Sequence, residues 1–303
     1  MCRRVMGASP ITGQPGGSSY PCPVADREGG PAIEVRAKLK GRVPPTDYAT
    51  VSGELRGGHL NVGSKQVEFD GAHVVDVDLS GKGLESFRVR ESIFERCDFR
   101  RFRSTMTLPA FGIPAPKQTV YRECRFDGAD LRRASVGEAR FESCVFDGAK
   151  IERLFSTHAE FIDCHFAGKI VSSNFCGRAP DLSTYLRRAP GRERRNEFRR
   201  NDFSEAGLID TAFKFGIDIS AQRWPRGPEY VRLDRLPGRF ARARKAIEAS
   251  TSGPARKAGL EMLHLYSHYG YEEQHELFAQ RDNPPTVPRK IRERVWDWLL
   301  LAP

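Results

Sequence analysis

The chain has 303 residues, 39% of them hydrophobic and 29% charged, and its 49 basic and 39 acidic side chains give a net charge of +10. This length is enough for one extended or two compact domains with a sizeable core. No segment approaches the roughly 20 consecutive apolar residues that a membrane-spanning helix needs, so no such helix is predicted.

Residues 1–30 are predicted to be a flexible segment, and residues 31–66 an N-terminal cap or an irregular first coil. No apolar run follows Arg3 and Arg4, so no secretory signal is predicted and a cytoplasmic location is expected. The seven cysteines form no C-x-x-C pair and have no zinc-ligand spacing. This pattern fits reduced thiols and predicts neither a metal centre nor another cofactor.

A five-residue period runs through residues 67–218. The motif C-x-F-D-G-A occupies residues 124–129 and recurs twenty positions later at 144–149. Most five-residue units have a bulky apolar residue at the centre, and the residue two positions before it is usually small. Neither a helix of period 3.6 nor a strand of period 2 gives this pattern over such a length. A fixed self-similar period is typical of a solenoid.

These units resemble those of the pentapeptide-repeat family, as in Ala129-Asp130-Leu131-Arg132-Arg133. The resemblance implies a mainly β fold, a right-handed quadrilateral β-helix in which four units complete one coil. Residues twenty apart would then lie directly above one another at the roughly 4.8 Å spacing of adjacent strands. Three inward columns are predicted. The first consists of Tyr121, Phe141 and Phe161, the second of Phe126, Phe146 and Phe166, and the third of Leu131, Ile151 and Val171. Glycines in the repeat are expected at the corners, at Gly71, Gly128 and Gly148.

Two interruptions of the period are predicted to be loops. Residues 105–118 are rich in proline, which cannot donate to a continuous ladder, and residues 177–195 are rich in arginine. The second loop is a candidate interaction site through Arg187, Arg188, Arg192, Arg194 and Arg195. An ordinary solvated loop is the alternative, and direct nucleic-acid binding is less favoured because aromatic residues are scarce there.

Residues 219–303 are predicted to form a helical cap or interaction region. Helices are expected at 238–250, at 254–281 as two helices joined near Gly270, and at 288–301. The last segment has an apolar face that could contact a membrane surface or a second copy in a homodimer, or could pack against the end of the coil. That face consists of Val295, Trp296, Trp298 and Leu299. The stretch around residues 270–281 also resembles a region that leads into the membrane helices of some bacterial pentapeptide-repeat proteins.

Two groups of potential ligands are interpreted as structural. Cys124, Cys144 and Cys164 lie one coil apart, and Cys97 joins them if about seven loop residues are inserted before Tyr121. Their slot requires a side chain of about the size of alanine, so packing is the preferred interpretation. A second group, around residues 264–275, has no H-E-x-x-H spacing and is not predicted to bind metal. It consists of His264, His268, His275, Glu272 and Glu273.

Function is predicted as non-enzymatic, because the sequence contains no phosphate-binding loop, dinucleotide fingerprint or nucleophile elbow. The preferred interpretation is a scaffold that binds an unidentified protein partner. One alternative that the resemblance implies is a resistance protein that binds a topoisomerase, DNA gyrase, by imitating DNA. A duplex mimic needs dense negative charge, but the repeat region without its loops has 18 basic and 22 acidic side chains. The other alternative is the soluble part of a membrane-associated protein.

Overall fold

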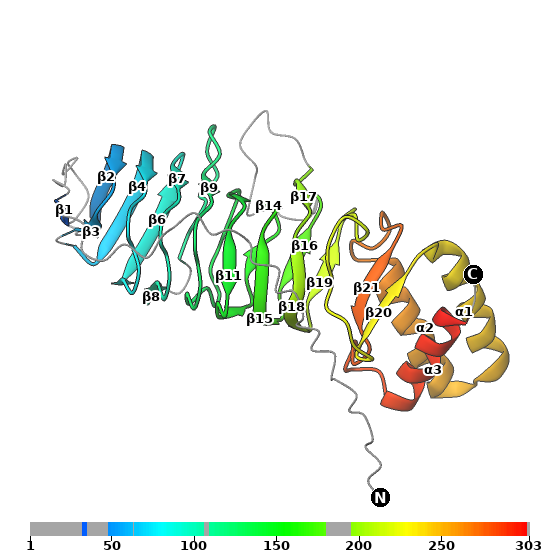
Figure 1. Cartoon of the computed structure of the whole chain (residues 1–303). Coiled ribbons are helices and arrows are strands. Elements are labelled where there is room, and N and C mark those ends of the chain that lie inside the picture. The colour runs from blue at the N-terminus through cyan, green and yellow to red at the C-terminus, as the bar shows by residue number, and fades with distance from the viewer. Residues whose placement is uncertain (1–31, 35–47, 63, 106–108, 180–194, 302–303) are drawn as a thin grey trace, which may run out of the picture.

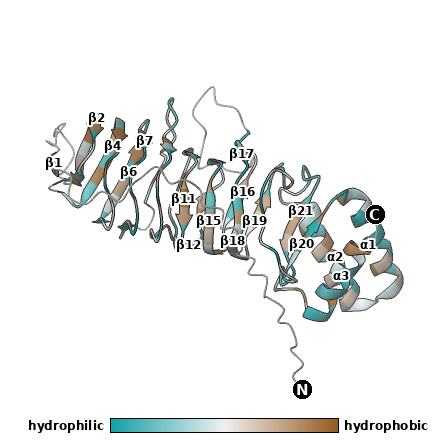
Figure 2. Cartoon of the chain, in the orientation of Figure 1, coloured by the Kyte–Doolittle hydropathy of each residue, from teal (hydrophilic) through white to brown (hydrophobic). Residues whose placement is uncertain are grey.

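The computed structural model describes residues 32–34, 48–62, 64–105, 109–179 and 195–301. Figure 1 shows a long coil of short strands followed by a C-terminal cap in which two strands lie between the coil and three helices. The predicted flexible segment 1–30 lies outside the described residues. Hydrophobic and hydrophilic residues alternate along many of the strands (Figure 2), as expected where one face of each strand is buried.

The strands of the coil are short, and their bounds follow in chain order. The first coils contain β1 (Ala32–Glu34), β2 (Tyr48–Arg56), β3 (His59–Asn61), β4 (Gln66–Val75), β5 (Gly83–Leu84), β6 (Ser86–Arg90), β7 (Ile93–Glu95) and β8 (Arg103–Ser104). The middle coils contain β9 (Val120–Arg122), β10 (Arg140–Glu142), β11 (Val145–Asp147), β12 (Ile151–Glu152), β13 (Phe155–Ser156) and β14 (Glu160–Ile162). The last coils contain β15 (His165–Val171), β16 (Asn174–Cys176), β17 (Phe198–Arg199), β18 (Asp202–Ile209) and β19 (Ala212–Lys214).

The coil is built from parallel strand pairs. Tyr121 pairs with Phe141 and Phe141 with Phe161, so the chain returns to the same place after twenty residues. The longest sheet follows the order β17-β14-β10-β9-β7-β4-β2, and β6 also pairs with β4. The predicted β-helix is therefore confirmed as a mainly β structure of parallel sheets that, within the described residues, ends in three helices.

Stacked aromatic rings fill the interior of the coil. Phe146 lies 4.9 Å from Phe126 and 4.8 Å from Phe166 between ring centroids, with the planes 7° and 4° apart. The neighbouring column is stacked in the same way, with 4.9 Å between Tyr121 and Phe141. Rings of different columns meet edge to face, a favourable arrangement for aromatic pairs. The two aromatic columns are thus confirmed as buried and aligned. The third predicted column is wrong at Val171, because Ile151 pairs with Ile170, and Ile170 is the buried residue at that place.

Small residues and glycines fit the narrow coil. Small side chains at the position two before a centre are fully buried, among them Cys124, Ala129 and Ala134. A second large side chain there would exceed the close packing of a protein interior. Gly128 and Gly148, predicted at corners, have φ of 65° and 60°, where glycine avoids the strain that a Cβ atom brings.

The prediction that residues 105–118 form a loop is wrong for part of this segment. Ala110 bridges Ser135 in the ladder and Phe111 is 1% exposed, so these two residues belong to the coil. Pro109 does not prevent this pairing, because its carbonyl accepts a hydrogen bond from the Ser135 amide. Phe94 pairs with Tyr121, 27 residues later, whereas one regular coil takes twenty. The seven extra residues are the insertion that was predicted before Tyr121. Residues 106–108 lie outside the described residues.

The cap contains β20 (Tyr230–Leu233), α1 (Leu236–Ser250), α2 (Gly253–Ser267), β21 (Leu277–Gln280) and α3 (Arg289–Leu300). The helix predicted after Gly270 is wrong, because that segment contains β21, which pairs antiparallel with β20. Phe278 of β21 stacks on Trp224 at 4.3 Å, and Trp224 stacks on Phe203 of the coil at 5.4 Å. The neighbours of Phe278 in β21 face the helices instead. Contacts on both faces therefore override the helical pattern of the sequence.

The apolar face predicted on the last helix is not an exposed surface. Val295, Trp296 and Leu299 are all 0% exposed and lie in the core formed with α1 and α2. Trp298 is partly buried against the same core, and the Arg294 guanidinium lies 4.9 Å from its ring centroid. The prediction of a membrane or dimer face is therefore wrong for the three buried residues, which pack within the cap. No helix in the described part of the chain is long and apolar enough to cross a membrane.

Replacing one stacked ring tests the contribution of the columns. We expect Phe146→Ala to lower the free energy of unfolding by about 3–5 kcal/mol, because it leaves a cavity between two rings. Phe155 is 50% exposed, so Phe155→Ala is the matched control and should change stability by about 0.5 kcal/mol or less. Denaturant unfolding followed by circular dichroism measures both. If both variants lose the same free energy of unfolding, the stacked column does not contribute more to stability than an exposed ring does.

Candidate interaction surfaces

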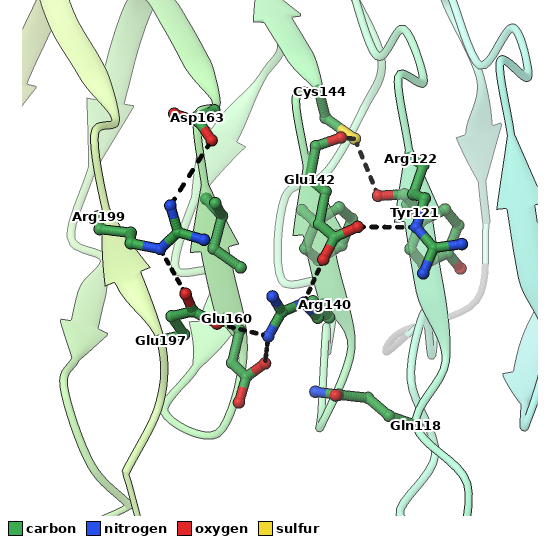
Figure 3. Close-up of polar contacts among 12 residues, drawn as sticks. Gln118, Tyr121, Arg122, Arg140, Glu142, Cys144, Glu160, Asp163, Glu197 and Arg199 are labelled. Atoms are coloured by element: carbon green, nitrogen blue, oxygen red, sulfur yellow. Dashed lines mark hydrogen bonds and ion pairs between the residues drawn. The ribbon is translucent and has the colours of Figure 1, made fainter.

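A ladder of ion pairs crosses the outer face of the longest sheet (Figure 3). In β10 the ring of Phe141 points inward, and Arg140 and Glu142 lie outside. Arg122 of β9 donates to Glu142 at 2.7 Å, and Arg140 reaches Glu160 of β14 at 2.9 Å. Because the strands pair in register, side chains from successive coils meet at hydrogen-bond distance. We call this set the ladder face; it comprises Glu95, Arg122, Arg140, Glu142, Glu160, Asp163, Glu197, Arg199 and Arg200.

Arg140 is the centre of the ladder face. Its guanidinium contacts three carboxylates, those of Glu142 at 2.5 Å, Glu160 at 2.9 Å and Glu197 at 2.7 Å. Burial would raise the pKa of Glu142, but hydrogen bonds from Arg140 and Arg122 outweigh it and hold that pKa below its ordinary value. A hydrogen bond from Arg199, supported by Arg140, lowers the pKa of Glu197. The carboxylates of Glu142 and Glu197 are thus held ionised.

The ladder face is balanced in charge and not acidic. Glu95 has Arg122 at 3.1 Å, and Asp163 has Arg200 at 2.5 Å. Since these carboxylates each lie beside a guanidinium, no run of unneutralised negative charge forms along the ladder face. A surface that imitates a DNA duplex would require one negative charge per roughly 1.7 Å. The sequence has nearly equal numbers of acidic and basic side chains in the repeat region, and in the structure they neutralise one another through ion pairs between coils.

The arginine-rich loop is described only at its ends. Arg195 forms an antiparallel bridge with Arg178, and the Arg178 guanidinium binds the Glu273 carboxylate of the cap at 2.5 Å. The base of the loop is therefore tied to the cap, a contact that the sequence did not suggest. The other candidates lie outside the described residues, and their role stays a prediction; they are Arg187, Arg188, Arg192 and Arg194.

The histidines and cysteines that were considered as ligands have other roles. The rings of His264 and His268 lie 3.9 Å apart with their planes tilted by 36°, at the exposed C-terminal end of α2. Within the described ranges, no three histidine, cysteine or acidic side chains gather in a way that could hold a metal ion. Cys144 lies in the buried column, and its Sγ donates to the Tyr121 carbonyl at 3.4 Å. Burial raises the pKa of Cys124 and Cys164 well above the ordinary value, which keeps these thiols protonated.

Two recesses near the cap were missed by sequence reasoning. One is an open groove of about 860 Å³ with Arg223, Trp224, Arg226 and Arg232 in its lining. The other is a smaller cavity of about 190 Å³ between the last coil and the cap. Their linings come from segments separated by 50 residues or more, such as Ser204 and Phe278, so no local spacing could reveal them.

Removing the central arginine tests the ladder face. Arg140→Gln leaves three neighbouring carboxylates without their shared cation, so we expect stability to fall by about 1–2 kcal/mol after solvent screening. The loss should shrink in about 1 M salt, where the Debye length is roughly 3 Å. Arg132 is exposed and contacts Asp130, so Arg132→Gln is the control and should change little. Urea unfolding of both variants at low and high salt measures the loss of stability. If the loss in Arg140→Gln does not depend on salt, it does not come from the ion pairs of Arg140.

The depressed pKa values also predict how stability depends on pH. Glu142 and Glu197 have lower pKa values in the folded chain than in the unfolded chain. Their contribution is therefore complete above the unfolded value of about 4.3 and is lost as pH falls through the lower folded values. Unfolding midpoints between about pH 3 and 6 should decline below about pH 4.3, and less steeply in Arg140→Gln. Identical slopes would show that Arg140 does not set these pKa values.

Comparisons with known proteins agree with the repeat. The family model for pentapeptide repeats matches residues 124–154, in eight copies. No curated protein matches the chain. The chain is similar to solved structures of QnrB1, a plasmid-mediated fluoroquinolone resistance protein. One trypsin-treated variant is 11% identical with a TM-score of 0.27, over 58% of this chain and 79% of its own.

A second trypsin-treated QnrB1 variant is 14% identical with a TM-score of 0.21, over 57% of this chain and 78% of its own. Full-length QnrB1 is 13% identical with a TM-score of 0.18, over 59% of this chain and 91% of its own. The matched residues, together with the parallel coil that returns every twenty residues, show that this chain contains pentapeptide repeats.

Proposed function

We propose that this protein is a non-enzymatic scaffold that binds a protein partner along the ladder face. The observation that carries the proposal is the ladder itself, in which charged side chains of successive coils hold one another in fixed positions. The right-handed, four-sided form of the coil and a cytoplasmic setting are parts of the same proposal. Free, buried thiols such as Cys124 and Cys144 fit a reducing compartment.

A rigid face lowers the cost of binding. Long arginine and glutamate side chains lose conformational freedom when a partner immobilises them, at about 0.5–1.5 kcal/mol each. In the ladder face Arg122 already contacts both Glu95 and Glu142, so much of that ordering has occurred before a partner arrives. A partner with a complementary pattern of charges would then gain specificity from positions fixed by the coil spacing.

The two alternatives receive less support from the same observations. The pairing of Glu142, Glu160 and Asp163 with arginines leaves the ladder face unlike the surface of a duplex. The membrane alternative relied on the apolar side of α3, and Trp296 and Leu299 of that side are buried in the cap. A gyrase supercoiling assay with the purified protein tests the topoisomerase alternative separately.

Affinity capture from the native host with charge-reversed variants tests the proposal. Arg122→Glu puts a third acid between Glu95 and Glu142 on the ladder face, and should abolish capture of a specific partner. Arg132, which lies outside the longest sheet, provides the control Arg132→Glu, and this variant should capture the partner as the unchanged protein does. Circular dichroism confirms that both variants are folded. If every captured protein binds both variants equally, the ladder face is not the binding surface.

A further inference from the structure

The smaller cavity lies where the last coil meets the cap. β19 of the coil, β21 and the end of α2 contribute to its lining, and Figure 1 shows these elements beside one another. Its volume is about 190 Å³. A cavity of about 150 Å³ in another protein binds benzene, so this one can hold a molecule of that size or slightly larger.

Two buried tyrosines line this cavity without using their hydroxyl groups. Tyr266 is 3% exposed and Tyr271 is 6% exposed, and their ring centroids lie 5.5 Å apart. Neither hydroxyl forms a hydrogen bond with any residue that the structure describes, and neither hydroxyl oxygen is fully buried. Both phenols are therefore free to form hydrogen bonds with a ligand in this cavity.

The same wall carries two opposite charges that do not pair with each other. The Lys214 ammonium is half-buried 5.1 Å from the Tyr271 ring centroid, with no carboxylate within ion-pair distance in the described part of the chain. Burial lowers the pKa of Lys214, and the charges of nearby groups such as Asp210 and Glu272 offset only part of that effect. Asp210 accepts a hydrogen bond from the Ser172 hydroxyl at 3.0 Å, and among the described residues no cation pairs with it.

A ligand with both charges would complement this wall. A plain carboxylate would satisfy Lys214 and leave Asp210 beside an added anion, and a plain amine would do the reverse. We propose that the cavity binds a small α-amino acid. Its carboxylate lies at Lys214 and the two phenol hydroxyls, and its ammonium lies at Asp210. Its side chain packs against the apolar part of the lining, which includes Leu265 and Pro284.

Binding there would join three elements. Lys214 belongs to β19 of the coil and Tyr266 to α2 of the cap, and the cavity is also lined by Ala279 of β21. A ligand held by all three would stabilise the coil against the cap by mass action, because it binds the folded chain and not the unfolded one. The melting temperature of the full chain is therefore a direct measure of binding.

A panel of the twenty amino acids tests the proposal on the full chain. We expect at least one, at up to about 10 mM, to raise the melting temperature and to give a dissociation constant below roughly 1 mM by calorimetry. Lys214→Met and Asp210→Asn should each weaken binding about tenfold or more, because each removes a charge-assisted hydrogen bond. The exposed Lys169→Met on β15 is the matched control and should bind normally.

Two further experiments test the proposal even if Lys214→Met does not fold. Tyr271→Phe removes only the hydroxyl, so it should weaken binding while leaving the melting temperature without ligand unchanged. For the amino acid that binds best, the analogue without its amino group and the analogue without its carboxylate should both bind at least tenfold more weakly. If no amino acid binds, or if either analogue binds equally well, the cavity is not an amino-acid site.

Discussion

The inward side chain at every fifth position is the constraint on which the rest of the structure depends. Once Phe126, Phe146 and Phe166 stack face to face, the register of the strands around them is set, because a shift by one residue would turn each ring outward. Parallel pairing in that register then places residues twenty apart side by side on the outer surface. The ladder face is thus a consequence of the core: the spacing that stacks rings inside also brings arginine beside glutamate outside.

The repeat could be predicted from sequence because each coil carries its own signal. The two aromatic columns, the buried cysteines and the seven-residue insertion before Tyr121 all follow from spacing. Spacing fails for the third column, where Ile170 and not Val171 pairs with Ile151. The errors lie where distant contacts decide. Phe111 rejoins the ladder despite the prolines around it. β21 is extended because Phe278 packs against Trp224 on one face, and Leu277 and Ala279 pack in the helical core on the other. For the same reason the face of α3 containing Trp296 is buried, since its partners are in α1 and α2.

The candidate sites divide in the same way. The pairing of Arg140 with Glu160 can be inferred once the twenty-residue period is known, because both are outward neighbours of inward rings. The cavity at the cap could not be inferred, since Lys214 and Tyr266 meet only through the packing of the coil on α2. The arginine-rich loop stays a sequence prediction, although the contact between Arg178 and Glu273 shows that its base is joined to the cap.

The way the aromatic column ends has a consequence for assembly. Phe203 is covered by Trp224 and then by Phe278, and Phe278 belongs to a strand that runs antiparallel to its partner. A further parallel coil from another molecule would find neither a free ring to stack on nor a matching edge to extend. Head-to-tail polymerisation into fibres, the hazard of any stack of identical coils, is therefore blocked at this end by Trp224 and Phe278.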